Sequence, residues 1–184
     1  LPSPPRHLFS VPIKVNPRDC VPKDYIRTNI KTNFKLIDKW LGKFPMHDTK
    51  CILVSGGPYT DYAELNALIE SNPTAKIIAV KHSYPKLLEH NIKPWACVVL
   101  DPRPITGTST HGIVRKDLFK TIDPSTKFFV ASMTDPSVTN YLIERKADIW
   151  GWHAFTESLR DPEEQKKGIH NNTVTLNKDL GLPE

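Results

Sequence analysis

The chain has 184 residues, 39% of them hydrophobic, which is enough to bury one core and too few for two comfortable domains. It contains no run of about 18 apolar residues that could cross a membrane, and its three cysteines show no CxxC spacing typical of a zinc site. We therefore expect a cytoplasmic protein that has no membrane-spanning segment, no structural zinc and no disulfide framework.

The net charge of +5 is concentrated near the N-terminus. Residues 1–50 contain ten Lys or Arg and four Asp or Glu, a net charge of +6, whereas residues 51–184 contain 15 and 16, a net charge of −1. A nucleic-acid-binding domain usually carries a basic patch on its folded body. Because the body of this chain is close to neutral, its charge argues against a nucleic acid as partner.

The N-terminal segment divides into an arm and a helix. Residues 1–22 contain six prolines, which lack backbone N–H donors and favour an extended arm. From residue 23 to about residue 41 apolar residues recur at helical spacing, and Gly42 supplies a stop, so this stretch is predicted to be an amphipathic helix. Basic residues at every fourth position give the helix a strip that is either a solvated face or a surface for an anionic ligand.

The rest of the chain alternates short apolar runs with helical segments. The predicted strands are residues 51–55, 76–80, 96–101, 127–131 and 148–152, and the predicted helices between them are 62–70, 85–90, 115–120 and 137–145. This alternation is typical of βαβ crossovers and of a mainly parallel sheet covered on both faces. The predicted fold class is therefore α/β, with a doubly wound Rossmann-like sheet.

These elements predict three parts of the chain. Residues 1–45 form the proline-rich arm and the basic amphipathic helix, and residues 46–155 form the Rossmann-like domain. Residues 156–184 are polar and contain no further apolar strand, so we interpret them as an incomplete end of the same domain.

The loops after the predicted strands are the places to look for chemistry, because ligands of open parallel sheets bind beyond the carboxyl ends of the strands. The first such loop contains Gly56 and Gly57, whose missing side chains let a phosphate approach the backbone. Asp61, with Glu64 three residues later, predicts a capped helix start. The loop matches neither GxGxxG nor GxxxxGKS, so a plain tight turn is the alternative.

Other strand ends carry charged or titratable residues. Asp101 ends the third strand, where a carboxylate can bind Mg²⁺ or a ribose, and Arg103 follows as a partner for phosphate. The alternative for Asp101 is a cap of its own loop. Lys81 ends the second strand, and His153 ends the fifth as either a general base or an ordinary surface histidine.

Several stretches around these loops occur in an order known from one family. They are Ile-Leu-Val-Ser-Gly-Gly-Pro (52–58), Lys-Ile-Ile-Ala-Val (76–80), and Leu-Leu-Glu-His-Asn-Ile-Lys-Pro (87–94) leading to Val-Val-Leu-Asp (98–101). In this order, over residues 51–152, the chain resembles the 6-hydroxymethylpterin diphosphokinase MptE-like family, which is related to motility accessory factors and sialyltransferase-like Rossmann domains. The family turn usually reads Gly-Pro-Ser-Leu, whereas Tyr59 and Thr60 follow Pro58 here.

The resemblance implies a nucleotide-dependent transferase. In a Mg²⁺-assisted diphosphokinase that acts from ATP on a hydroxymethylpterin-like acceptor, Arg103 and the turn would bind the nucleotide, Asp101 would bind the cofactor Mg²⁺, and Lys81 would offset charge. The turn residues are Ser55, Gly56, Gly57, Pro58 and Thr60. Two alternatives stay open: a glycosyltransferase that uses a nucleotide-sugar, with His153 or His82 as general base, and a non-catalytic ligand-binding module. The implied partners are a nucleotide and a small-molecule acceptor.

Overall fold

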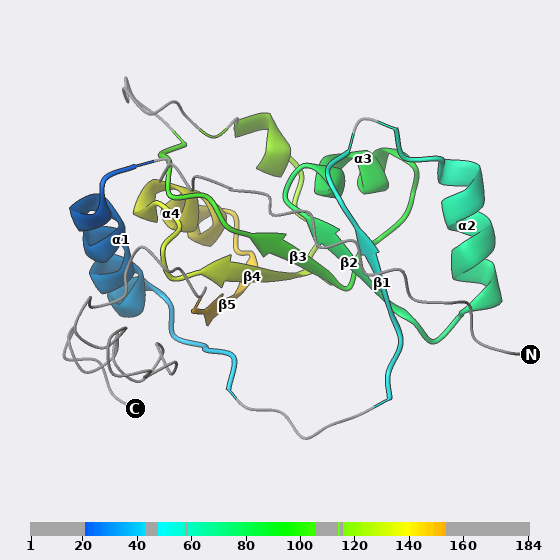
Figure 1. Ribbon diagram of the computed structural model, residues 1–184, viewed down its shortest axis with the longest axis horizontal. Coiled ribbons are helices and arrows are strands. Elements are labelled where there is room, and N and C mark those ends of the chain that lie inside the picture. Colours follow the sequence, from blue (N-terminus) through cyan, green and yellow to red (C-terminus); the bar gives the residue numbers. More distant parts are fainter. Residues whose placement is uncertain (1–20, 43–47, 58, 106–113, 115, 154–184) are drawn as a thin grey trace, which may run out of the picture.

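The structure is a computed structural model and describes residues 21–42, 48–57, 59–105, 114 and 116–153. The elements in these ranges are α1 (Lys23–Leu36), β1 (Cys51–Val54), α2 (Tyr62–Ser71), β2 (Lys76–Val80), α3 (Ser83–Glu89), β3 (Ala96–Val99), the 3-10 helix η1 (Lys116–Phe119), β4 (Lys127–Ala131), α4 (Pro136–Glu144) and β5 (Asp148–Trp152) (Figure 1). None of these helices is long and apolar enough to span a membrane. The predicted polar segment 156–184, and the predicted arm up to residue 20, lie outside the described residues.

The five strands form one all-parallel sheet in the order β1-β2-β3-β4-β5 (Figure 1). Val54, Ala79, Cys97 and Phe128 pair in one row across the first four strands. Helices lie between consecutive strands along the chain. The predicted α/β class is confirmed, and the arrangement is consistent with a doubly wound Rossmann-like fold.

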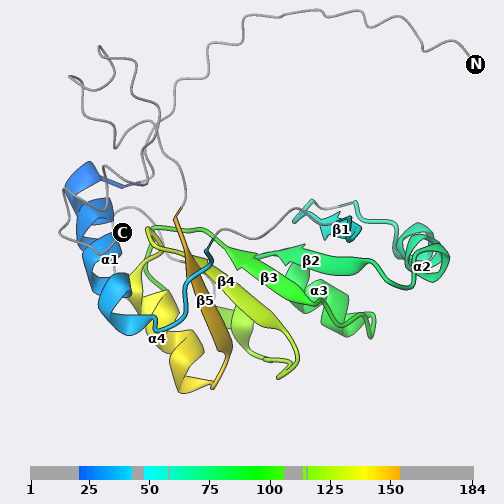
Figure 2. The same cartoon turned by 90° about the horizontal axis from the view of Figure 1, so that it is seen from below.

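The main core lies between one face of the sheet and the connecting helices. Alternate strand residues, such as Cys97 and Val99 of β3, are fully buried and belong to one cluster with Tyr84 of α3 and Leu142 of α4. The Tyr84 ring meets Phe128 of β4 edge to face, with 5.2 Å between ring centroids. Figure 2 shows α3 and α4 on the same side of the sheet, as expected when right-handed crossovers proceed in one direction across it.

Helix α1 reaches the other face of the sheet near the ends of β4 and β5. Ile26 and Ile30 are buried in a second cluster with Ala131 of β4, and Trp152 of β5 packs against this cluster. Because successive side chains of a strand point to opposite faces, Ala131 lies on the opposite face from Val130, which belongs to the main core. Helix α1 therefore packs at the carboxyl ends of β4 and β5, where Asn33 also accepts a hydrogen bond from Thr139 of α4.

The N-terminal helix is shorter than predicted, because α1 ends at Leu36 rather than near residue 41. Beyond it, Trp40 forms an isolated parallel bridge with Gly151 of β5. The N–H of Leu41 donates to the Gly151 carbonyl at 2.8 Å, and the Gly151 N–H donates to the Lys39 carbonyl at 2.8 Å. Pairing with the edge of the sheet thus overrides the helical spacing of the apolar residues.

The other predicted elements match the structure closely. β2, β4 and β5 have the predicted bounds. α2 ends one residue later than predicted, and α4 begins and ends one residue earlier than predicted. β3 ends at Val99 instead of residue 101, and α3 begins at Ser83 instead of residue 85. The segment predicted as a helix over 115–120 is the short 3-10 helix η1.

Candidate functional site

The carboxyl edge of the sheet brings together the loops that carry the candidate residues. Because the strands are parallel, the glycine turn after β1, Lys81 after β2 and Asp101 after β3 lie on one edge, as the sequence predicts. The loop after β4 joins them, since the N–H of Asp135 donates to the carbonyl of Asp101 at 3.0 Å.

The two glycines of the turn have different surroundings. A Cβ atom on Gly56 would lie 2.8 Å from Cβ of His82, so even a methyl group would force the start of α3 to move. A Cβ atom on Gly57 would meet nothing closer than Ser55 Oγ at 3.9 Å. Gly56 is therefore explained by its close packing against His82, whereas the exposed Gly57 leaves space for a ligand. Pro58 lies outside the described residues.

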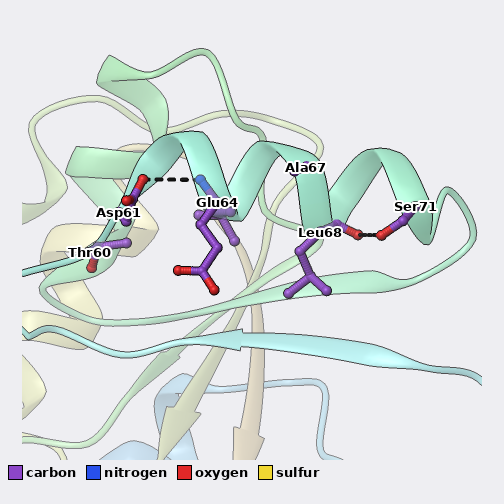
Figure 3. A pocket seen from close by; sticks show the side chains of 7 residues that line it. Thr60, Asp61, Glu64, Ala67, Leu68 and Ser71 are labelled. Carbon is purple, nitrogen blue, oxygen red and sulfur yellow. Dashed lines mark hydrogen bonds between the residues drawn. The ribbon is translucent and has the colours of Figure 1, made fainter.

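Helix α2 begins after the predicted capping residue. Asp61 Oδ1 accepts a hydrogen bond from the N–H of Ala63 at 2.9 Å. It also accepts one from the N–H of Glu64 at 3.0 Å, which Figure 3 shows. The cap thus satisfies the N–H groups of Ala63 and Glu64 in the first turn of the helix. A shallow hollow of about 480 Å³ runs along the helix, and Thr60 lies at its end beside Asp61 (Figure 3).

Buried Asp101 and Lys81 form an ionic cluster with the partly exposed Arg103, which we call the carboxyl-edge triad. Asp101 is 4% exposed and Lys81 is 7% exposed. The Arg103 guanidinium donates to the carboxylate from Nε to Oδ1 and from Nη2 to Oδ2, both at 2.8 Å. The Arg103 backbone N–H donates to Oδ1 at 3.1 Å, and Lys81 Nζ donates a short hydrogen bond to Oδ2. Two cations share one carboxylate, so the triad carries a surplus positive charge.

The triad keeps Asp101 ionised. Burial raises the pKa of this carboxyl, but the hydrogen bonds from Arg103 and Lys81 outweigh burial and lower the pKa to about 2, below the ordinary value of 3.8. At neutral pH the carboxylate is therefore available to hold both cations.

The surroundings of Asp101 do not fit a directly bound Mg²⁺ ion. An ionised carboxylate has about four lone-pair positions, and the donors of Lys81 and Arg103 make four hydrogen bonds to it. A divalent cation would also meet two cations that already lie beside the carboxylate. Within the described part of the chain, no three potential metal-binding side chains of His, Cys, Asp or Glu lie together. The predicted role of Asp101 as a magnesium ligand thus has no support in its contacts.

Two buried asparagines of α1 hold the loops after β3 and β4. Asn33 Nδ2 donates to two carbonyls of the β4 loop, at 2.9 and 2.5 Å, and accepts at Oδ1 from Thr139 Oγ1 at 2.8 Å. Asn29 Nδ2 donates to the carbonyl of Pro102 and to the β4 loop, each at 3.2 Å. Sequence reasoning missed both residues. The available signal was a pair of amide side chains one helical turn apart among the apolar positions of the helix, where a polar residue needs a buried partner.

Tyr25 adds a third contact from α1, which sequence reasoning also missed. Its hydroxyl donates to Asp135 Oδ2 at 2.5 Å. Burial, followed by the interaction with Asp135, raises the pKa of Tyr25 to about 12, so the phenol remains the donor. Asp135 in turn caps α4 by accepting from the N–H of Ser137 at 2.8 Å.

His153 is not brought together with Asp101. It follows β5, which β4 separates from β3. Its ring stacks on Trp40 with 4.8 Å between ring centroids, and burial lowers its pKa. The histidine that lies beside the glycine turn is His82, which approaches Gly56.

A cleft of about 660 Å³ opens beside the glycine turn, between α3 and η1. Gly56 and His82 form its wall at the carboxyl edge, and Leu118 contributes apolar surface. Two basic and two acidic residues also line the cleft: Lys86, Lys120, Glu89 and Asp117. A volume of this size, lined by apolar and polar groups, suits a small-molecule ligand.

The comparison with protein families extends the region of similarity into α1. No curated protein and no solved structure matches the chain. The family model described as 6-hydroxymethylpterin diphosphokinase MptE-like matches residues 25–177. The match therefore includes the triad, the described strands and both buried asparagines of α1. The chain belongs to the 6-hydroxymethylpterin diphosphokinase MptE-like family.

Proposed function

We propose that this protein is a nucleotide-dependent transferase that binds the phosphate groups of its nucleotide at the carboxyl edge of the sheet. The observation that carries the proposal is the carboxyl-edge triad, which fixes Lys81 and Arg103 where parallel sheets bind their ligands. The exposed backbone at Gly57 adds a surface that a phosphate can approach. Membership of the family favours diphosphokinase-type transfer from ATP to a hydroxymethylpterin-like acceptor.

The reaction asks the protein to position its substrates and to offset charge. In diphosphokinase transfer, the acceptor hydroxyl oxygen attacks the β-phosphorus of ATP and forms a new O–P bond. The bond from the β-phosphorus to the α,β-bridging oxygen breaks, and AMP leaves with that oxygen. The hydroxyl proton passes to a base, for which His82 beside the turn is the candidate. Fixed cations such as Arg103 stabilise the negative charge on the transferred group.

A glycosyltransferase that uses a nucleotide-sugar is the second candidate. It is favoured by the position of His82, which is exposed, lies beside Gly56 and lines the cleft between α3 and η1. A histidine in this place can take the proton of a sugar acceptor. The third candidate, a non-catalytic binding module, predicts binding of the same nucleotides without turnover.

Product analysis tests the proposal. The full chain is incubated in Mg²⁺ buffer with ATP and 6-hydroxymethylpterin, or with CMP-sugar and a sugar acceptor, and a thermal-shift panel adds GTP, CMP and NAD. We expect equal amounts of AMP and diphosphorylated pterin. Release of CMP from CMP-sugar would favour the glycosyltransferase, and a thermal shift without product would favour the binding module. If no nucleotide shifts the melting temperature, the proposal fails.

A further inference from the structure

We infer that Asp101 is a positioning residue that holds Arg103 as a rigid receptor for a phosphoryl group, and that this group binds without a metal ion between it and Asp101. The inference rests on the proposed function, because it assumes that a phosphate-containing ligand binds at the carboxyl edge of the sheet. It goes further by naming Arg103 as the residue that receives the phosphoryl group. Three features of the described residues support it: the rigidity of the loop, the order of exposure in the triad, and the saturation of the carboxylate.

The loop that carries Arg103 is fixed on both sides. Arg103 stands between Pro102 and Pro104, whose rings restrict the backbone φ angles. The carbonyl of Pro102 accepts from Asn29 Nδ2 at 3.2 Å, and the carbonyl of Pro104 accepts from the N–H of Val114 at 2.7 Å. A receptor that is ordered before its ligand arrives loses less conformational entropy on binding.

Exposure increases from Asp101 to Arg103. The Asp101 side chain is 5% exposed and that of Lys81 is 9% exposed, whereas the Arg103 side chain is 36% exposed. Asp101 accepts hydrogen bonds from Nε and Nη2 of the guanidinium. The surplus positive charge of the triad is therefore presented by a planar guanidinium, a group whose geometry matches phosphate oxygens.

The carboxylate has no position left for a metal ion. The four hydrogen bonds from Lys81 and Arg103 account for its lone pairs. Direct binding of Mg²⁺ to Asp101 would have to displace a lysine or an arginine. We therefore expect the receptor to bind a phosphoryl group in the presence of a chelator.

The experiment measures binding of inorganic pyrophosphate to the full chain by calorimetry, in EDTA and again in Mg²⁺. We expect binding in EDTA, and we expect Arg103→Ala to weaken it at least about tenfold, because a charge-assisted hydrogen bond is lost. Arg145→Ala is the matched control. Arg145 is exposed and follows α4 near the amino ends of the strands, away from the carboxyl edge. Its guanidinium lies over the Tyr141 ring.

Chemical rescue separates positioning from a general structural role. Added methylguanidinium should restore part of the pyrophosphate binding of Arg103→Ala, because Asp101 offers the same two oxygens to the free cation. It should restore nothing when Asp101→Asn is combined with Arg103→Ala. If the double variant does not fold, Arg103→Lys replaces it: without the side-on pair of hydrogen bonds, Lys should bind pyrophosphate more weakly than Arg.

The inference is overturned if pyrophosphate binds only with Mg²⁺, if it does not bind at all, if Arg103→Ala binds as the wild type does, or if methylguanidinium rescues both variants equally. The proposed function fails separately. Chelator-resistant, Arg103-dependent binding of pyrophosphate without any nucleotide binding would support the inference and contradict the transferase. AMP formation that Arg103→Ala leaves unchanged would support the transferase and contradict the inference.

Discussion

The side chain of Asp101 offsets the charges of Lys81 and Arg103 in a buried setting. Asp101→Asn keeps the shape but leaves two cations without their counter-ion, so we expect the free energy of unfolding in urea to fall by about 3–5 kcal/mol. Asp148→Asn is the control, because Asp148 also pairs with two lysines, whose side chains are 55% and 35% exposed. That variant should lose less than about 1 kcal/mol. Equal losses would contradict the buried character of the triad.

The lowered pKa of Asp101 predicts sensitivity to acid. Its pKa is about 2 in the folded protein against an ordinary value of 3.8, so the unfolded chain takes up the proton more readily. The stabilisation is fully present above the unfolded pKa and is lost as the pH falls through the folded pKa. We expect the free energy of unfolding to fall more steeply for the wild type than for Asp101→Asn between about pH 5 and about pH 2. Parallel curves would show that the carboxylate is not held.

The two glycines of the turn should respond differently to substitution. Gly56→Ala places a methyl group against His82, and the strain should lower the free energy of unfolding by about 1–3 kcal/mol. Gly57→Val meets open space, so it should leave the unfolding curve nearly unchanged and weaken nucleotide binding by occupying the room of a phosphate. Denaturant unfolding and calorimetry of both variants measure the two effects. Unchanged nucleotide affinity in Gly57→Val would leave the turn with a structural role alone.

At the scale of elements, the extended stretch after α1 depends on one close contact at the edge of the sheet. A Cβ atom on Gly151 would lie 2.6 Å from Cε3 of the Trp40 ring. Gly151→Ala should therefore destabilise the protein, and Trp40→Ala in the same chain should relieve part of the loss. A double-mutant cycle of unfolding free energies measures the coupling, which we expect to exceed about 0.5 kcal/mol. Additive losses would show that the ring moves aside without cost.

Sequence patterns predicted most elements because the strands are short apolar runs separated by clear breaks. β2, β4 and β5 have the predicted bounds. The end of α1 could not be predicted, since its apolar spacing continues beyond Leu36 and only the hydrogen bonds to Gly151 decide the outcome. Local periodicity cannot report a partner that lies more than a hundred residues away.

At the scale of the whole molecule, the candidate site is assembled from four loops and one helix. Parallel strands explain why Gly57, Lys81 and Asp101 share an edge, and this much follows from the sequence. The ion pairs of the triad and the contacts of Asn33 with the β4 loop depend on side-chain packing, so they could not be predicted. Two facts about His153 likewise could not be predicted from the sequence: β4 separates it from Asp101, and its ring stacks on Trp40.

The contacts of α1 also bear on the order in which the chain can fold during its synthesis. This helix leaves the ribosome before β1 to β5, yet Tyr25 and Asn33 bond to residues that follow 99 to 110 positions later. The cluster that Ile26 and Ile30 form with Ala131 and Met133 therefore cannot be complete until β4 and the loop after it have emerged. Docking of α1 is a late event of high sequence separation, which slows folding and exposes apolar surface in the meantime. The loop of Arg103 gains its hydrogen bond from Asn29 only at that step.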